Sequence, residues 1–159
     1  MRIQTKVERK SERELVASRI INGPSRLVFE AWTNPELFKK WWMPKSAPIT
    51  LVSCEMEVRT GGKYRLVLSM GSQNMEFFGK YLEVTPYSRI VWTNDEGGED
   101  AAVITTVTFE EIDGTTLVTV RDLYPSKEAL DAAIASESTG ALPEQLEQLD
   151  QLIVNQGKL

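Results

Sequence analysis

The sequence of 159 residues contains no histidine, and this absence removes much of the chemistry on which enzyme sites depend. Histidine is the commonest general base, the usual partner of a serine or cysteine nucleophile, and the commonest zinc ligand. Cys54 is the single cysteine, and it lies in the middle of a predicted strand, where a thiol is expected to be buried and inert. We therefore expect no metal site, no cofactor and no catalytic residue of a standard type.

Charged residues on the predicted strands are the remaining candidates for acid–base chemistry. A charge that points into an apolar cavity is costly unless it is paired, so such a charge often marks a functional site. Arg121 is the strongest candidate, and it shares one face of its strand with Leu117 and Thr119. Val120 and Asp122 belong to the other face, and the alternation leaves open which face points inward and which lies in solvent. The other strand charges of this kind are Glu55, Glu57, Arg65 and Glu76.

Aromatic residues recur along the chain, and two interpretations of them stay open: ordinary core packing, or the wall of a cavity. Tryptophan and tyrosine favour a cavity wall, because each brings a polar group to an apolar surface. Trp41 and Trp42 point about 100° apart on a helix, so we expect only one of them to face the cavity. Both interpretations apply to Phe38, Trp41, Trp42, Tyr64, Phe77 and Trp92.

These residues lie on elements that the hydrophobic pattern predicts. Helical spacing after Pro24 and an Asn34-Pro35 start signal predict two short helices. After Pro125 the pattern is helical again, and a last helix begins at Pro143. Alternation and turn residues predict seven strands. The predicted strands cover residues 14–22, 49–58, 64–70, 75–84, 89–93, 102–112 and 115–123.

The order of these elements predicts an α+β domain with a curved antiparallel sheet of about six or seven strands. Short connections favour an antiparallel meander over βαβ units. A sheet with one apolar face must be covered on that face, and the terminal helix, with its stripe through Leu146, Leu149 and Ile153, is long enough to do so. We expect a flexible tail at 1–11 and one domain at 12–157.

Composition excludes several classes of partner. The net charge of -5 and the pI of about 4.9 disfavour nucleic-acid binding, because there is no excess of cations to neutralise phosphates. No apolar run approaches the roughly 18 residues that span a bilayer, and the N-terminus lacks the apolar core of a signal peptide. We therefore expect a cytoplasmic protein without a membrane partner, either a monomer or a homodimer.

Several segments together resemble one known family. Residues 28–37 (VFEAWTNPEL) followed by Trp41-Trp42-Met43-Pro44 resemble the SRPBCC (START/Bet v 1-like) superfamily, and more narrowly its branch named after the C-terminal domain of the activator of Hsp90 ATPase. Similar matches lie at residues 58–65, 79–86, 89–93 and 106–115, so the resemblance extends over about 14–155. It implies a helix-grip fold, in which the sheet wraps around the long C-terminal helix with a hydrophobic cavity between them. The residues that we expect to line this cavity are Phe38, Trp41, Trp42, Tyr64, Leu66, Phe77, Trp92, Val107, Phe109, Arg121, Leu142, Leu146 and Leu149.

The resemblance implies a function in that cavity, where superfamily members bind hydrophobic or amphipathic small molecules and some are enzymes. Our first hypothesis is a non-catalytic binder of a small apolar or aromatic molecule. The second is an enzyme acting on a hydrophobic substrate, such as a cyclase, hydrolase or isomerase, with a carboxylate, tyrosine or arginine as acid or base. The third is a protein-interaction or stress-response module that docks through the region of Trp41 and Trp42. The absence of histidine favours binding over catalysis.

Overall fold

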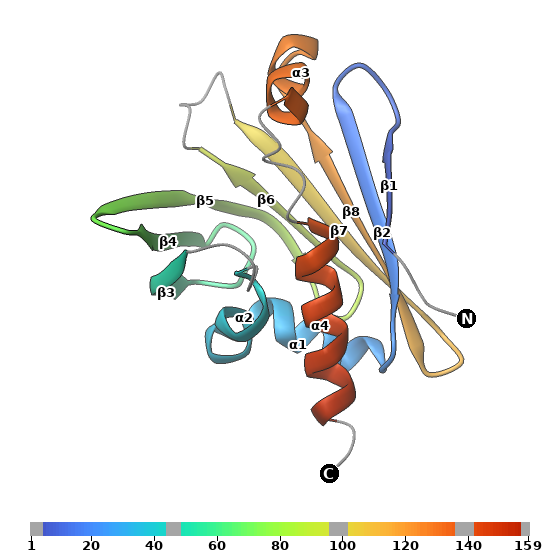
Figure 1. Ribbon diagram of the computed structural model, residues 1–159. Helices are drawn as coiled ribbons and strands as arrows, with labels where there is room; N and C mark the ends of the chain where they lie inside the picture. Colours follow the sequence, from blue (N-terminus) through green and yellow to red (C-terminus); the bar gives the residue numbers. More distant parts are fainter. Residues whose placement is uncertain (1–4, 44–48, 96–101, 136–141, 157–159) are drawn as a thin grey trace.

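An antiparallel sheet of eight strands curves around a long C-terminal helix in the part of the chain that the structure describes (Figure 1). The computed structural model describes residues 5–43, 49–95, 102–135 and 142–156. This arrangement confirms the predicted α+β helix-grip fold. The helices are α1 (Ser25–Thr33), α2 (Pro35–Trp41), α3 (Lys127–Ala135) and α4 (Leu142–Gln156). The strands are β1 (Lys6–Arg9), β2 (Glu14–Ile21), β3 (Thr50–Met56), β4 (Lys63–Met70), β5 (Gln73–Thr85), β6 (Arg89–Asn94), β7 (Val103–Ile112) and β8 (Thr115–Leu123).

The strand order is β1-β2-β8-β7-β6-β5-β4-β3, so only the pair β2 and β8 joins distant parts of the sequence. Asp113 and Gly114 connect β7 to β8 with φ values of 52° and 83°, and positive φ at both positions suits the twist of a tight hairpin. The pairing of β5 with β6 shifts register between Tyr81 and Glu83. Such a bulge bends the strand, and the β3–β5 side of the sheet curls toward α2 (Figure 1).

β1 lies in the stretch 1–11, for which the sequence predicts a flexible tail, and that prediction is wrong for residues 6–9. The strand pairs antiparallel with β2, with Lys6 opposite Ser18. The Arg9 guanidinium also lies 2.7 Å from a carboxylate oxygen of Asp131 on α3. All of β1 is exposed, so the segment lacks the apolar alternation by which a strand is recognised.

Helix capping follows the sequence closely. The Asn34 side chain accepts a hydrogen bond from the Glu36 N–H (3.0 Å), and Pro35 takes the first helical position of α2. The Ser126 hydroxyl oxygen accepts from the Ala129 N–H (3.0 Å) at the start of α3. Both caps satisfy N–H groups that have no partner inside the helix.

Two glutamines tie α4 to the C-terminal end of α2. The Gln145 Nε2 group donates to the carbonyl of Trp42 (2.6 Å). The Gln148 Nε2 group donates to the carbonyls of Trp41 (2.7 Å) and Met43 (2.8 Å). Because the last carbonyls of a helix lack partners within it, α4 supplies the hydrogen bonds that α2 needs in a buried place.

The apolar stripe of α4 packs against β2, α1 and α2. Leu146, Leu149 and Ile153 are buried on this stripe, while the side chain of Leu142 lies outside the described residues.

None of the helices in the described ranges combines the length and the apolar composition that a membrane-spanning helix needs.

Candidate ligand-binding site

The aromatic residues divide into a packed core and a partly open inner face. Trp32 of α1 is the centre of the core, and its ring centroid lies 4.7 Å from that of Trp41 and 6.0 Å from that of Trp42. The corresponding distances to Trp92 and Phe109 are 5.7 and 6.2 Å. The prediction of cavity residues missed Trp32, although its helical spacing from Val28 gave the signal that it points inward.

Trp41 and Trp42 occupy different environments, as their angular separation on a helix requires. Trp41 is fully buried, and its Nε1–H donates to the Ala31 carbonyl (2.9 Å). Trp42 is half-buried and stacks on Phe38, with ring centroids 4.8 Å apart and an interplanar angle of 24°. Trp42, rather than Trp41, therefore remains at the margin of the core.

Three half-buried aromatic side chains on the sheet also pack against the edge of the core: Tyr64, Phe77 and Trp92. The Tyr64 hydroxyl donates to the carbonyl of Thr93 (2.6 Å), which fixes its ring on the inner face. Of the other predicted cavity residues on the sheet, Leu66, Val107 and Phe109 are buried in the core. The partly open residues are therefore the ones that a bound molecule can still cover.

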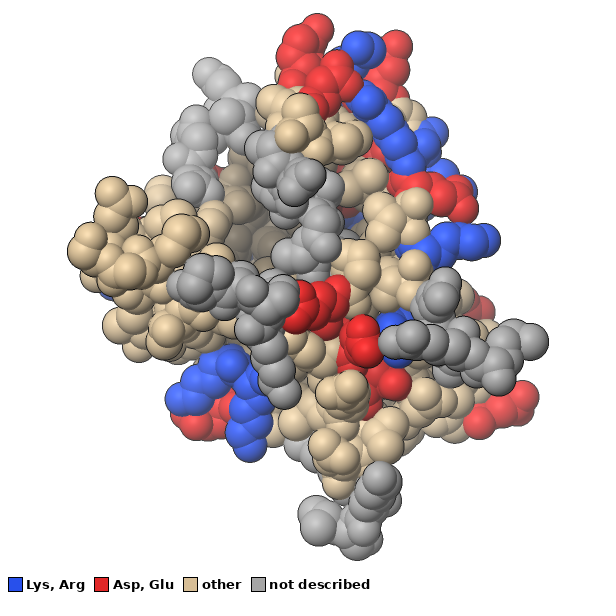
Figure 2. All heavy atoms as spheres, viewed as in Figure 1, with Lys and Arg blue, Asp and Glu red and all other residues tan. Residues whose placement is uncertain are grey.

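Among the described residues, no helix covers the concave face of the sheet along its whole length (Figure 1). Strands β6, β7 and β8 extend past the first turn of α4 toward α3 (Figure 1). Figure 2, drawn from the same side, shows a hollow in the surface above α4, between the curled β3–β5 side of the sheet and the end where α3 lies. We call this region the upper hollow.

A carboxylate lies on the inner face at this end of the sheet. Asp122 shares its face of β8 with the buried Val118 and Val120. It is paired across the strands with Thr105 of β7, whose hydroxyl donates to Asp122 Oδ1 (2.6 Å). Thr105 in turn lies opposite Trp92 of β6. The polar pair therefore adjoins one of the half-buried aromatic rings.

Burial raises the pKa values of the Asp122 carboxyl and of the Tyr124 hydroxyl. Burial raises the pKa of the Asp122 carboxyl, and the Thr105 hydrogen bond opposes that rise only in part. Burial, with a smaller contribution from the negative charge of Asp122, raises the pKa of Tyr124 to about 12. A carboxyl whose pKa is raised in this way is a candidate for binding or acid–base chemistry.

Arg121 does not join the inner set. Its side chain is 54% exposed, and its guanidinium lies 3.6 Å from a carboxylate oxygen of Glu14 on the outer face. The apolar residues of β8 occupy the even positions, so Asp122 points inward and Arg121 points to solvent. The expectation that Arg121 lines the cavity is therefore corrected. The other strand charges considered as candidates are exposed as well: Glu55, Glu57, Arg65 and Glu76. Arg65 pairs with Glu76 at 2.8 Å.

One protein family, described as activator of Hsp90 ATPase homolog 1-like protein, matches residues 22–153. The chain belongs to this family. The match extends from the end of β2 into the last turns of α4, so it includes the upper hollow and the polar pair, and it confirms the resemblance to the SRPBCC superfamily. A search of the curated proteins gives no match.

Solved structures share the family's fold at low sequence identity. A protein of Nitrosomonas europaea is 22% identical, with a TM-score of 0.84 over 95% of this chain and 100% of its own. A protein of Rhodobacter sphaeroides is 20% identical, with a TM-score of 0.86 over 96% and 99%. The AHSA1-like protein of Aeromonas hydrophila is 17% identical, with a TM-score of 0.71 over 89% and 94%. Likeness at this level concerns the fold and leaves the function open.

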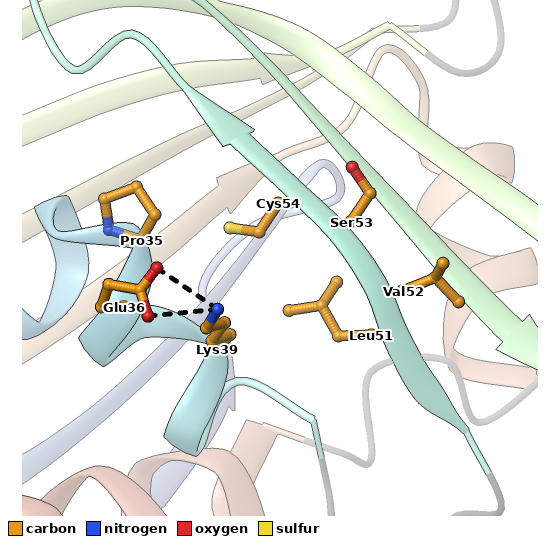
Figure 3. Close-up of a pocket in the computed structure, with 7 residues that line it drawn as sticks. All are labelled: Pro35, Glu36, Lys39, Leu51, Val52, Ser53 and Cys54. Atoms are coloured by element: carbon orange, nitrogen blue, oxygen red, sulfur yellow. Dashed lines mark hydrogen bonds and ion pairs between the residues drawn. The ribbon is translucent and has the colours of Figure 1, made fainter.

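A second concavity lies between α2 and β3, outside the grip (Figure 3). Its volume is about 100 Å³, which is less than the roughly 150 Å³ of a cavity that holds benzene. Cys54 lies in its wall, and burial raises the pKa of the thiol, so the reactive thiolate is disfavoured. Glu36 and Lys39 form an ion pair at its rim (3.2 Å). Within the described ranges, no group of three or more histidine, cysteine or acidic residues is placed to hold a metal ion.

Because the pKa of Asp122 is raised, we expect the stability difference between the wild type and the Asp122→Asn variant to depend on pH. Because the folded state holds this proton more tightly than the unfolded state, stability falls as pH rises from the ordinary aspartate pKa of about 3.9 through the raised folded value. Asp122→Asn removes this penalty and keeps an acceptor for Thr105. We expect the variant to be more stable by on the order of 1 kcal/mol at pH 7.5, with the difference shrinking toward pH 3.5. Urea denaturation at both pH values measures it.

The control for this prediction is Glu110→Gln, which removes the same charge from the exposed face of β7. It should show little difference from the wild type at either pH. An equal gain for Asp122→Asn at both pH values would contradict a carboxylate destabilised by burial.

Proposed function

We propose that the chain binds a small apolar or aromatic molecule in the upper hollow. The observation that carries the proposal is the set of half-buried aromatic residues that pack at the edge of the core, Trp42, Tyr64, Phe77 and Trp92. Such side chains form the usual lining of small-molecule sites, together with a few polar groups that fix orientation. Membership of a family whose fold commonly binds hydrophobic ligands supports the same function.

The size of the expected effect follows from apolar burial. A ligand that covers about 200 Å² of apolar surface gains on the order of 5 kcal/mol, before the loss of translational freedom is subtracted. We therefore expect simple aromatic probes to bind in the micromolar-to-millimolar range, with tighter binding for the physiological ligand. Native mass spectrometry of gently purified protein is the direct search for that ligand.

Adjacent phenylalanines on β5 give a matched test of the site. Phe77 is half-buried against the core, whereas Phe78 is 40% exposed on the other face of the strand. With 3-ethylindole as the probe, Phe77→Ala should weaken binding by about tenfold, since a buried aromatic contact is lost. Phe78→Ala should change the affinity by less than about twofold. Calorimetric titration of the three proteins measures both.

Equal losses in the two variants would place the probe elsewhere on the surface, and the proposal would then fail. Saturable binding that only Phe77→Ala weakens supports a site on the inner face.

Asp122 favours a second candidate function, an enzyme acting in the same hollow. An inward carboxyl with a raised pKa can serve as a general acid or base, and Tyr124 is a further proton donor nearby. The test is to incubate the recovered ligand with wild-type and Asp122→Asn protein and to follow its mass. Turnover by the wild type alone supports catalysis, and an unchanged ligand supports binding.

The third possibility, a docking module, loses its main support. Trp41 is fully buried, so the Trp41-Trp42 region does not present the exposed aromatic pair on which such an interface would depend.

A further inference from the structure

The Asp122 carboxylate has one polar partner among the described residues, and that partner is neutral. Thr105 donates to Oδ1, and Oδ2 receives no hydrogen bond from the described residues. Three arginines on adjoining segments are otherwise engaged. Arg121 pairs with Glu14 on the outer face, and Arg13 donates from Nε to the Tyr124 carbonyl (2.9 Å). Arg19 points inward from β2 but pairs with Asp150 of α4. The described part of the chain therefore offers this carboxylate no balancing cation.

The surroundings of the pair are apolar and aromatic. Leu15 of β2 lies opposite Asp122, and Trp92 lies opposite Thr105. Cross-strand neighbours have Cβ atoms about 5 Å apart, so both side chains adjoin the pair. Leu15 is buried, and Trp92 is half-buried. A buried charge without a countercharge lowers the stability of the folded protein. A ligand that brings a positive charge to Asp122 therefore restores this stability when it binds.

We propose that the ligand of the upper hollow is an aromatic or aliphatic amine, whose ammonium group binds Asp122 Oδ2 while its apolar body lies against Trp92. This inference rests on the proposed function and names the class of its ligand. An ionised carboxylate accepts hydrogen bonds only, so its complement is a donor. A protonated amine supplies both the donor and the missing charge, and its hydrogen bond to a carboxylate is stronger than that of a neutral alcohol. The nearby indole also attracts a cation.

Three indoles with the same body separate charge from shape: tryptamine, indole-3-ethanol and 3-ethylindole. At pH 7.5 only tryptamine carries a charge. We expect it to bind the wild-type protein at least about tenfold more tightly than 3-ethylindole, with indole-3-ethanol closer to 3-ethylindole. Calorimetric titration at low ionic strength gives the three dissociation constants.

Asp122→Asn should abolish the preference for tryptamine, because the neutral amide no longer balances the charge of the ammonium group. Glu110→Gln is the control, since it removes the same net charge from the outer face and should retain the preference. Circular dichroism and melting curves establish that both variants fold.

The outcomes distinguish this inference from the function on which it rests. If all three indoles bind with similar affinity, or if Asp122→Asn keeps the preference, the amine assignment is overturned and the apolar site stands. If none of the three binds at millimolar concentration, both are overturned for aromatic ligands of this size.

Discussion

Replacing Trp41 with alanine is expected to lower the free energy of unfolding by about 4 kcal/mol, as is typical for a large aromatic residue removed from a core. Trp41 has no exposed surface, and its ring lies 4.7 Å from that of Trp32 and 5.5 Å from that of Phe38. The change also leaves the Ala31 carbonyl without its indole donor. Urea denaturation of the variant and the wild type measures the loss, which is a large part of the 5–15 kcal/mol of a typical domain.

The neighbouring tryptophan is the matched control. Trp42 is half-buried and stacks on Phe38 from the margin of the core, so Trp42→Ala should cost about 1–2 kcal/mol. A similar cost for both variants would contradict the division into a core residue and a margin residue. We also expect Trp41→Ala to impair ligand binding only through the loss of folded protein.

The sequence indicated which aromatic residues point inward, but it did not indicate which of them are fully buried in the core and which lie at its margin. The helical angle between Trp41 and Trp42 requires different environments for the two, without saying which is buried. That choice depends on where α2 meets α1, because Trp32 fills the space on one side of Trp41. Such contacts join separate elements, and local periodicity does not contain them.

The inward charge on β8 was predictable in part. Alternation separated Arg121 from Asp122, and it left open which face is inward. The pairing of Val120 with Val107 resolves this, because both are buried and Asp122 continues the same face. That signal was present in the sequence as two apolar faces on neighbouring strands. The inward face of β8 can be assigned only when the strand register is known. The Asp113-Gly114 turn sets this register at the other end of the hairpin.

Local chemistry predicted the fold best wherever a short motif decides the backbone. The Asn34-Pro35 start of α2 and the hairpin between β7 and β8 agree with their expected positions. β1 was not predictable in this way, because each of its residues is exposed. Its strand conformation comes from pairing with β2, and its place beside α3 is supported by the ion pair between Arg9 and Asp131.

Replacing Asp150 with alanine is expected to lower the free energy of unfolding by about 3 kcal/mol, because it leaves a nearly buried cation unpaired. Arg19 points inward from β2, its side chain is 10% exposed, and its guanidinium lies 3.6 Å from the Asp150 carboxylate on α4. Arg19 Nε is buried and has no hydrogen-bond partner. Asp150 also accepts from the Asn22 backbone N–H (2.7 Å), so one side chain holds α4 to the end of β2.

A double-mutant cycle separates the cost of the unpaired charge from the value of the pair. If the cost comes from leaving Arg19 charged and alone, Arg19→Met in the Asp150→Ala background should recover at least about 1 kcal/mol. Asp150→Asn keeps an acceptor for the Asn22 N–H and should cost less than Asp150→Ala. Strictly additive losses in the cycle, measured by urea denaturation, would mean that the two side chains do not interact. A coupled pair instead means that the Asp150 carboxylate holds α4 against β2, just as Gln145 and Gln148 hold it against α2.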